Sequence, residues 1–223
     1  MRLPKKKGKK PHALGKEEYE TLEQTLYRTF ENKKSVAVLL ALKTGIRLGE
    51  LSALKWTDID IEEGTIYIRN AVQRVKTFGK KTAKTEMVFD GTKTFSSSRA
   101  IPMNDEIREF LLKYAGQVKK NGGSLKEDFV FSNCDRSFID PRVYQYYFSK
   151  LLKQTGIKQT NFHALRHTFA TVAASKNMQI SVLSRILGHS DISTTLRLYV
   201  HPLVEQDRIE MCKISKSYWS QSA

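Results

Sequence analysis

The spacing of apolar residues predicts a mainly helical chain. From residue 16 onward, leucine and phenylalanine recur every four positions among polar residues, which is typical of an amphipathic helix over 16–32. Residues 34–44 are apolar almost all round and end at Gly45, which predicts a buried helix with a glycine stop. Similar patterns predict further helices over 48–54, 104–119, 140–155, 162–176, 179–187 and 191–204.

Between the third and fourth predicted helices, the apolar residues recur at every second position. Residues 65–69 alternate and are rich in β-branched side chains, which predicts a strand, and further strands are expected at 86–89 and 99–103. The polar, lysine-rich segment 76–84 is typical of a hairpin tip or a disordered loop, and 129–131 is a candidate extra strand. The pattern therefore predicts an α+β fold, mainly α with one small antiparallel β-sheet inserted.

Length and charge narrow the class of protein. A chain of 223 residues can form one large domain or two small ones. Its 38 Lys+Arg against 23 Asp+Glu give a formal net charge of +15, which suits a polyanionic partner such as nucleic acid. Charge alone is equally compatible with a merely basic soluble protein.

Cysteine usage and hydropathy exclude several other classes. Cys134 and Cys212 lie far apart, which argues against a disulfide framework and structural zinc and fits a reducing cytosol. The longest strongly apolar run, 36–42, is far too short to span a bilayer. No apolar segment follows the basic start, so we expect no signal peptide.

Two arginines have neighbours suited to binding a phosphate. Arg47 follows the apolar helix, and Glu50 three residues on can hold its guanidinium, although a purely structural Arg–Glu pair explains this segment more simply. His163 and Arg166 share one helix face near a helix N-terminus, where they could clamp the oxygens of one phosphate. His167 points elsewhere on the helix and is expected to be structural.

His189 and Tyr199 are the next candidate site residues along the chain. Gly188 is a good helix stop and Ser190 or Asp191 a good N-cap, so His189 is expected in a tight turn, where a structural histidine is the ordinary interpretation. Tyr199 ends an amphipathic helix, where core or interface roles are commoner than catalysis. A phenol has a pKa near 10, so it needs nearby cations or a proton acceptor to act as a nucleophile.

Taken in order, these segments resemble the tyrosine recombinases, the site-specific recombinases of the phage integrase type. The resemblance rests on residues 44–51 (TGIRLGEL), 163–168 (HALRHT), 187–189 (LGH) and Tyr199, and it extends from about residue 16 to about residue 211. It implies a mainly helical catalytic fold related to type IB topoisomerases. It also implies an integrase of a mobile genetic element that cuts and rejoins DNA.

The resemblance also implies a role for each residue. Arg47 and Arg166 would hold the scissile phosphate, His189 would donate a further hydrogen bond, and His163 would act as an acid or base. Tyr199 would attack phosphorus and leave a 3′-phosphotyrosyl link.

A lysine and a carboxylate complete the implied set. Lys93 would protonate the departing 5′ oxygen, with Lys84 as its competitor and Lys76 as a weaker one. Glu50 would orient Arg47 or a neighbouring histidine. No metal, ATP or other cofactor is implied, because two arginines supply the positive charge.

The resemblance further implies how the chain is organised. The lysines, prolines and glycines of residues 1–15 by themselves indicate a basic flexible arm or interdomain linker, or equally a disordered solubilising tail. The resemblance makes 16–205 the catalytic domain and 206–223 a tail that contacts another protomer or caps its own domain. The chain would be excised from a longer protein with an N-terminal DNA-binding domain. Its expected partners are double-stranded DNA and copies of itself in a tetrameric synapse, with no membrane, in the bacterial cytosol at the nucleoid.

Two other functions remain open. One is a catalytically silent DNA-binding relative of the family. The other is a metal-dependent nuclease that uses His163, His189 and His201, although the clustered carboxylates such a site needs are missing.

Overall fold

The computed structural model describes residues 13–76, 85–91, 98–126, 128–189 and 191–199, within which lie eight α-helices and five strands. The helices are α1 (Lys16–Arg28), α2 (Lys33–Thr44), α3 (Leu48–Ala53), α4 (Asp105–Lys120), α5 (Pro141–Gln154), α6 (His163–Ser175), α7 (Ile180–Leu187) and α8 (Ser193–Tyr199), and a 3-10 helix covers Trp56–Asp58. The predicted helices are confirmed in order and to within a few residues at their ends. The end of the last predicted one, 200–204, lies outside the described residues.

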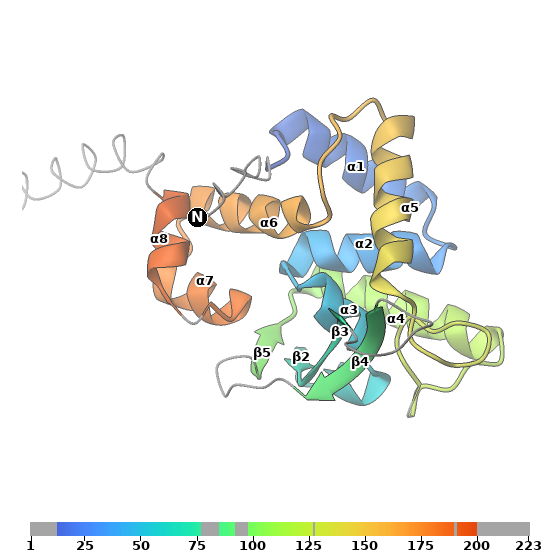
Figure 1. The fold of residues 1–223 in the computed structure, drawn as a ribbon. Coiled ribbons are helices and arrows are strands. Elements are labelled where there is room, and N and C mark those ends of the chain that lie inside the picture. Colours follow the sequence, from blue (N-terminus) through green and yellow to red (C-terminus); the bar gives the residue numbers. More distant parts are fainter. Residues whose placement is uncertain (1–12, 77–84, 92–97, 127, 190, 200–223) are drawn as a thin grey trace, which may run out of the picture.

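Helix α2 is the centre of the domain, in contact with α1, α3, α4, α5 and α6 (Figure 1). Residues 36–42 are at most 1% exposed, as their uninterrupted apolar pattern predicted. The helix ends at Gly45, which has a φ of 66°. A Cβ there would lie 2.7 Å from Cδ1 of Phe169 on α6, so only glycine ends α2 here without displacing that side chain.

The strands form two antiparallel sheets where one was expected. They are β1 (Ile59–Asp60), β2 (Thr65–Ile68), β3 (Asn70–Lys76), β4 (Thr85–Gly91) and β5 (Arg99–Pro102). One sheet has the order β1-β2-β5, and β3 pairs with β4 in the other. The three predicted strands are confirmed, but 129–131 contributes only an isolated bridge between Phe129 and Lys55.

Strand β3 was not predicted, and packing explains why it forms. Its two valines, Val72 and Val75, are three positions apart, so the strand lacks the alternation that marks a half-buried strand. The strand pairs with β4 in a register that places Val72 opposite Phe89, and it packs against α3. A Cβ at Gly49 would lie 2.5 Å from the Val72 carbonyl oxygen, so glycine at this position allows the close approach.

The C-terminal helices bring distant segments to one place. Helix α8 packs against α6 and α7, and α7 packs against β5 (Figure 1). The end of α7 therefore lies near the start of β5 and the junction between α2 and α3. In the described part of the chain no helix combines the length and apolarity needed to cross a bilayer. Cys134 is an exposed free thiol, and Cys212 lies outside the described residues.

Candidate active site

Arg47 lies between α2 and α3, and Glu50 holds it. The Arg47 backbone N–H donates to Glu50 Oε2 at 2.9 Å, and Nη1 donates to Oε1 at 2.8 Å. The Arg47 Nη2 donates to the Gly188 carbonyl oxygen at 2.7 Å, 141 residues further along the chain. The ion pair expected from the spacing is present, and it points the guanidinium at the end of α7, with 38% of the side chain exposed.

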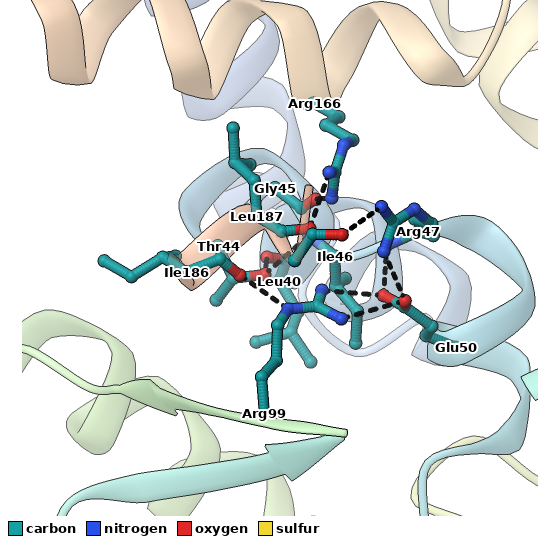
Figure 2. A network of polar contacts seen from close by, with 11 residues as sticks. Leu40, Thr44, Gly45, Ile46, Arg47, Glu50, Arg99, Arg166, Ile186 and Leu187 are labelled. Atoms are coloured by element: carbon teal, nitrogen blue, oxygen red, sulfur yellow. Dashed lines mark hydrogen bonds and ion pairs between the residues drawn. The ribbon is translucent and has the colours of Figure 1, made fainter. Parts of the chain in front are cut away.

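A third arginine, absent from the predicted site, shares the same carboxylate. Arg99 donates from Nη1 to Glu50 Oε1 at 2.9 Å and from Nη2 to Oε2 at 2.8 Å, and Figure 2 shows the two groups face to face. Its Nε donates to the Ile186 carbonyl oxygen at 2.6 Å. The sequence carried a signal for this, because the period of two places Arg99 on the same face of β5 as the buried Ile101, where an arginine needs a partner.

Arg166 lies one turn into α6 and is buried. Its Nη1 donates to the Gly45 carbonyl oxygen at 2.9 Å, and its Nη2 donates to the Leu187 carbonyl oxygen at 2.6 Å (Figure 2). The guanidinium therefore links the end of α2 to the end of α7.

Three consecutive carbonyl groups at the end of α7 thus accept from three different arginines. Arg99 binds the carbonyl of residue 186, Arg166 that of 187 and Arg47 that of 188. The last carbonyls of a helix have no partner within the helix and lie at the negative end of its dipole, so cations are favoured there. We call this segment, residues 186–188, the carbonyl turn.

Glycine allows the carbonyl turn to close. Gly188 has a φ of 62°, which ends α7 in the left-handed region as predicted. A Cβ at this position would lie 2.8 Å from Cδ of Arg99, so the turn and the arginine are in direct contact. His189 follows immediately and is therefore held next to the arginines.

His189 is also tied to α8. Its Nδ1 lies 2.8 Å from Oγ1 of Thr195, which is fully buried. When the hydroxyl donates, the ring proton lies on Nε2, which is then the free donor of the imidazole. The predicted cap at the start of α8 is present in part, since the Asp191 carboxylate accepts from the Ser193 N–H at 2.9 Å.

His163 begins α6, one turn before His167. Their rings meet edge to face, with centroids 4.9 Å apart and an interplanar angle of 89°. Burial, His167 and the charges of Arg166 and Arg47 lower the pKa of His163 to about 4. Because His163 as a whole is exposed, water screens part of this effect. Burial, followed by the charges of Arg166, Arg47 and Arg99, also lowers the pKa of His189 to about 4.

Arg47, Arg99 and Arg166, which we call the arginine cluster, carry more positive charge than the acidic groups bonded to them balance. Burial alone would raise the pKa of Glu50, but its hydrogen bonds and charge interactions with Arg99 and Arg47 outweigh burial, so the pKa lies below its usual value. Burial and the charge of Arg47 lower the pKa of Arg166 to about 9, which leaves it protonated at neutral pH. Among the described residues, the cluster therefore contains three arginines and one carboxylate, which pairs with Arg47 and Arg99, and this excess of positive charge favours an anionic ligand.

Arg47 and Arg166 keep donors for such a ligand. A guanidinium has five N–H donors, and within the described residues each of these two uses two of them. The remainder can bind the oxygens of a phosphate, for which the planar fork is well suited.

The remaining predicted residues are described in part or not at all. Tyr199 is the last residue of α8, and only its backbone is described, so its role stays a prediction. Lys93 and its competitor Lys84 lie outside the described residues, and Lys76 is the last residue of β3.

The described residues contain no group of three or more His, Cys, Asp or Glu side chains that could hold a metal ion. His201, which the nuclease hypothesis requires, lies outside that part of the chain.

The sequence matches the model of the phage integrase family over residues 12–206. It is 31% identical over 177 residues to a tyrosine recombinase XerC-like protein of Caldanaerobacter subterraneus subsp. tengcongensis, which covers 75% of this chain and 45% of that protein. It is 30% identical over 188 residues to the integrase of Staphylococcus phage L54a, which covers 81% of this chain and 51% of that protein. The chain thus spans about half the length of these curated relatives.

Solved structures agree with the sequence matches. The Tn1549 transposon integrase in complex with transposon right end DNA superposes with a TM-score of 0.74 and 25% identity, covering 95% of this chain and 69% of that one. The XerA recombinase gives a TM-score of 0.65 at 25% identity, covering 87% of this chain and 61% of that one. The fold class predicted from the sequence is confirmed, and the chain belongs to the phage integrase family of tyrosine recombinases.

Proposed function

We propose that this chain is the catalytic domain, over residues 16–205, of a site-specific DNA recombinase of the integrase type. The observation that carries the proposal is the arginine cluster. Arg47 and Arg166 come from distant segments to one helix end, each with donors to spare, beside a turn that holds His189. Membership of a family whose solved members include integrases in complex with DNA supports DNA as the ligand.

The proposed reaction is a transfer between two phosphodiesters. Arg47 and Arg166 bind the non-bridging oxygens of the scissile phosphate and stabilise the charge that develops on them. The phenolic oxygen of Tyr199 attacks phosphorus and gives up its proton while the bond from phosphorus to the 5′ oxygen breaks, leaving a 3′-phosphotyrosyl link. Lys93 supplies the proton that the 5′ oxygen takes up. Attack by another 5′ hydroxyl reverses these steps without ATP or a metal ion.

The histidines act on the same phosphate. A neutral His163 can accept the phenolic proton, because its lowered pKa keeps it unprotonated at neutral pH in the absence of DNA. His189 donates from Nε2 to a phosphate oxygen while its Nδ1 stays bound to Thr195. A bound phosphate raises the pKa of both rings, which favours the proton transfer from the phenol.

The net charge of +15 supports binding along the DNA backbone, where 1–15 would serve as a further basic arm. Segment 206–223 is proposed to contact a second protomer in a tetrameric synapse, in the bacterial cytosol at the nucleoid.

Covalent trapping tests the proposal without a known target site. The protein is incubated with duplex oligonucleotides of randomised central sequence that carry a nick downstream, so that the cut-off strand diffuses away. We expect adducts that resist denaturant, form in the presence of a chelator and map to Tyr199. Tyr199→Phe should form none. Binding without any adduct would instead identify a catalytically silent relative, and chelator-sensitive cutting without an adduct would identify a metal-dependent nuclease.

A further inference from the structure

We propose that Arg99 is a positioning residue of the active site: through Glu50 it aims the Arg47 guanidinium, and through the Ile186 carbonyl it places the turn that precedes His189. This role rests on the strand-transfer reaction proposed above. It assigns a function to a residue that lies outside the set of groups in contact with the phosphate.

The donors of Arg99 are directed at protein groups. Only 4% of its side chain is exposed, against 38% for Arg47. Its Nε, Nη1 and Nη2 each donate to a protein oxygen, on Ile186 or Glu50. Because these bonds occupy all three nitrogens and the group is buried, Arg99 is unsuited to binding DNA directly and well suited to fixing its neighbours.

Through Glu50, Arg99 acts on Arg47. Both carboxylate oxygens accept from Arg99, and each also accepts from Arg47, one from Nη1 and one from the backbone N–H. The plane of the carboxylate is therefore set by two guanidinium groups that face it from different elements. Without Arg99 the carboxylate is free to turn toward Arg47, and the Arg47 fork turns with it.

Through the carbonyl turn, Arg99 acts on His189. The Nε bond to the Ile186 carbonyl, at 2.6 Å, and the close packing of the Arg99 side chain on Gly188 fix the last turn of α7. His189 follows this turn directly, and its ring reaches Thr195 on α8. A displacement of the turn therefore moves the histidine and the helix that ends at Tyr199.

Substitutions at position 99 test this role with an oligonucleotide selected by the trapping experiment. Arg99→Lys keeps the charge but cannot bond both carboxylate oxygens and the carbonyl together. We expect adduct formation at saturating DNA to slow by about 10- to 100-fold, the range for a small misplacement of catalytic groups. The Kd for DNA should change by less than about threefold, because the side chain is buried away from the ligand. Arg99→Met should be slower than Arg99→Lys.

A modified substrate separates positioning from a general loss of structure. In a scissile methylphosphonate, a methyl group replaces one charged oxygen, so the reaction depends less on the charge that Arg47 supplies. The slowing of adduct formation by Arg99→Lys should therefore be smaller on this substrate. In a protein that already carries Arg47→Ala, Arg99→Lys should slow adduct formation no further. A matched control is Arg69→Lys, since Arg69 pairs at 2.9 Å with the buried Asp58 outside the site. This variant should form adducts at the unaltered rate.

A second measurement needs neither DNA nor catalysis. Phenylglyoxal modifies accessible guanidinium groups, and mass spectrometry reports the extent at each arginine. When the Arg47 guanidinium turns with the carboxylate, its Nη2 loses the bond to the Gly188 carbonyl oxygen. Arg99→Lys should therefore raise the modification rate of Arg47 by about fivefold, the factor that loss of one ordinary hydrogen bond allows.

The outcomes distinguish this inference from the proposed function. Unaltered protein that forms no adduct refutes the proposed function, and the labelling rate of Arg47 then decides whether Arg99 aims it. Normal adduct formation by unaltered protein and by folded Arg99→Lys and Arg99→Met alike refutes the role of Arg99 only. An unchanged labelling rate of Arg47 in Arg99→Lys, or a defect of equal size on the methylphosphonate, also overturns it.

Discussion

Replacing Glu50 by glutamine removes the negative charge at the centre of the arginine cluster and keeps the shape of the side chain. The carboxylate accepts four hydrogen bonds, two from Arg99 and two from Arg47. An amide accepts at its oxygen but presents an NH2 group at the other end. Two of the four donors then face another donor in a site where the Glu50 side chain is only 5% exposed.

The structure gives a magnitude for this change. Hydrogen bonds to charged groups contribute about 1.5–3 kcal/mol each, so losing two corresponds to about 3–6 kcal/mol. Arg47 is 38% exposed and can turn to water, which lowers the figure, whereas Arg99 cannot. We therefore expect Glu50→Gln to lower the free energy of unfolding by about 3–5 kcal/mol, typical of breaking a buried ion pair. The melting temperature should fall by about 6–20 °C.

Urea unfolding of both proteins at several pH values measures the effect. The pKa of Glu50 in the folded protein lies below its usual value, so its stabilising effect is complete above the unfolded pKa and is lost as pH falls through the folded one. The difference in the free energy of unfolding between wild type and Glu50→Gln should thus be constant near neutral pH and become smaller below about pH 4.

Asp58→Asn is a matched control in the same fold. Asp58 is buried, but its arginine partner, Arg69, is 51% exposed and can be solvated. We expect a smaller loss, about 1–2 kcal/mol. A Glu50→Gln loss below about 1 kcal/mol at neutral pH, or one that grows in acid, would show that the carboxylate does not hold the cluster together.

Three further predictions concern the surroundings of the proposed phosphate site. In an NMR titration without DNA, His163 and His189 should remain neutral well below pH 6.5, and Arg47→Ala should raise the pKa of both rings because it removes a nearby positive charge. Thr195→Val should slow adduct formation by about tenfold while Thr195→Ser retains it, since only the hydroxyl fixes the His189 tautomer; equal rates would contradict this. Gly188→Ala should lower the free energy of unfolding by about 1–3 kcal/mol, from its left-handed backbone and the clash with Arg99, and a fully stable variant would contradict it.

The sequence predicted those features of the fold and of the site that depend on residues close together in the chain. The apolar run 36–42 predicted the central helix, and glycines 45 and 188 predicted where two helices end. The pairing of Arg47 with Glu50 followed from their spacing within one helical turn. Each of these features is determined by residues within a few positions of one another, where periodicity and capping rules apply.

Features that depend on contacts between distant segments could not be predicted in the same way. Strand β3 forms because its backbone pairs with β4 and fits against Gly49, and neither contact is visible in its own residues. Arg99 is separated from Glu50 by 49 residues and from Ile186 by 87, so its partners emerge only in the folded chain. Its place on the buried face of β5 gave a sign that it had partners, without revealing which.

The carbonyl turn also determines when, during synthesis of the chain, the proposed phosphate site can form. Its three acceptors belong to residues near the C-terminal end of the described chain, while the donor of Arg47 lies 141 residues earlier. During synthesis, a ribosome-bound fragment that stops before residue 186 contains the three guanidinium groups and Glu50, but it lacks the three carbonyl groups that also bind them. Such a fragment therefore cannot complete the proposed phosphate site, which forms only after α7 has packed against β5.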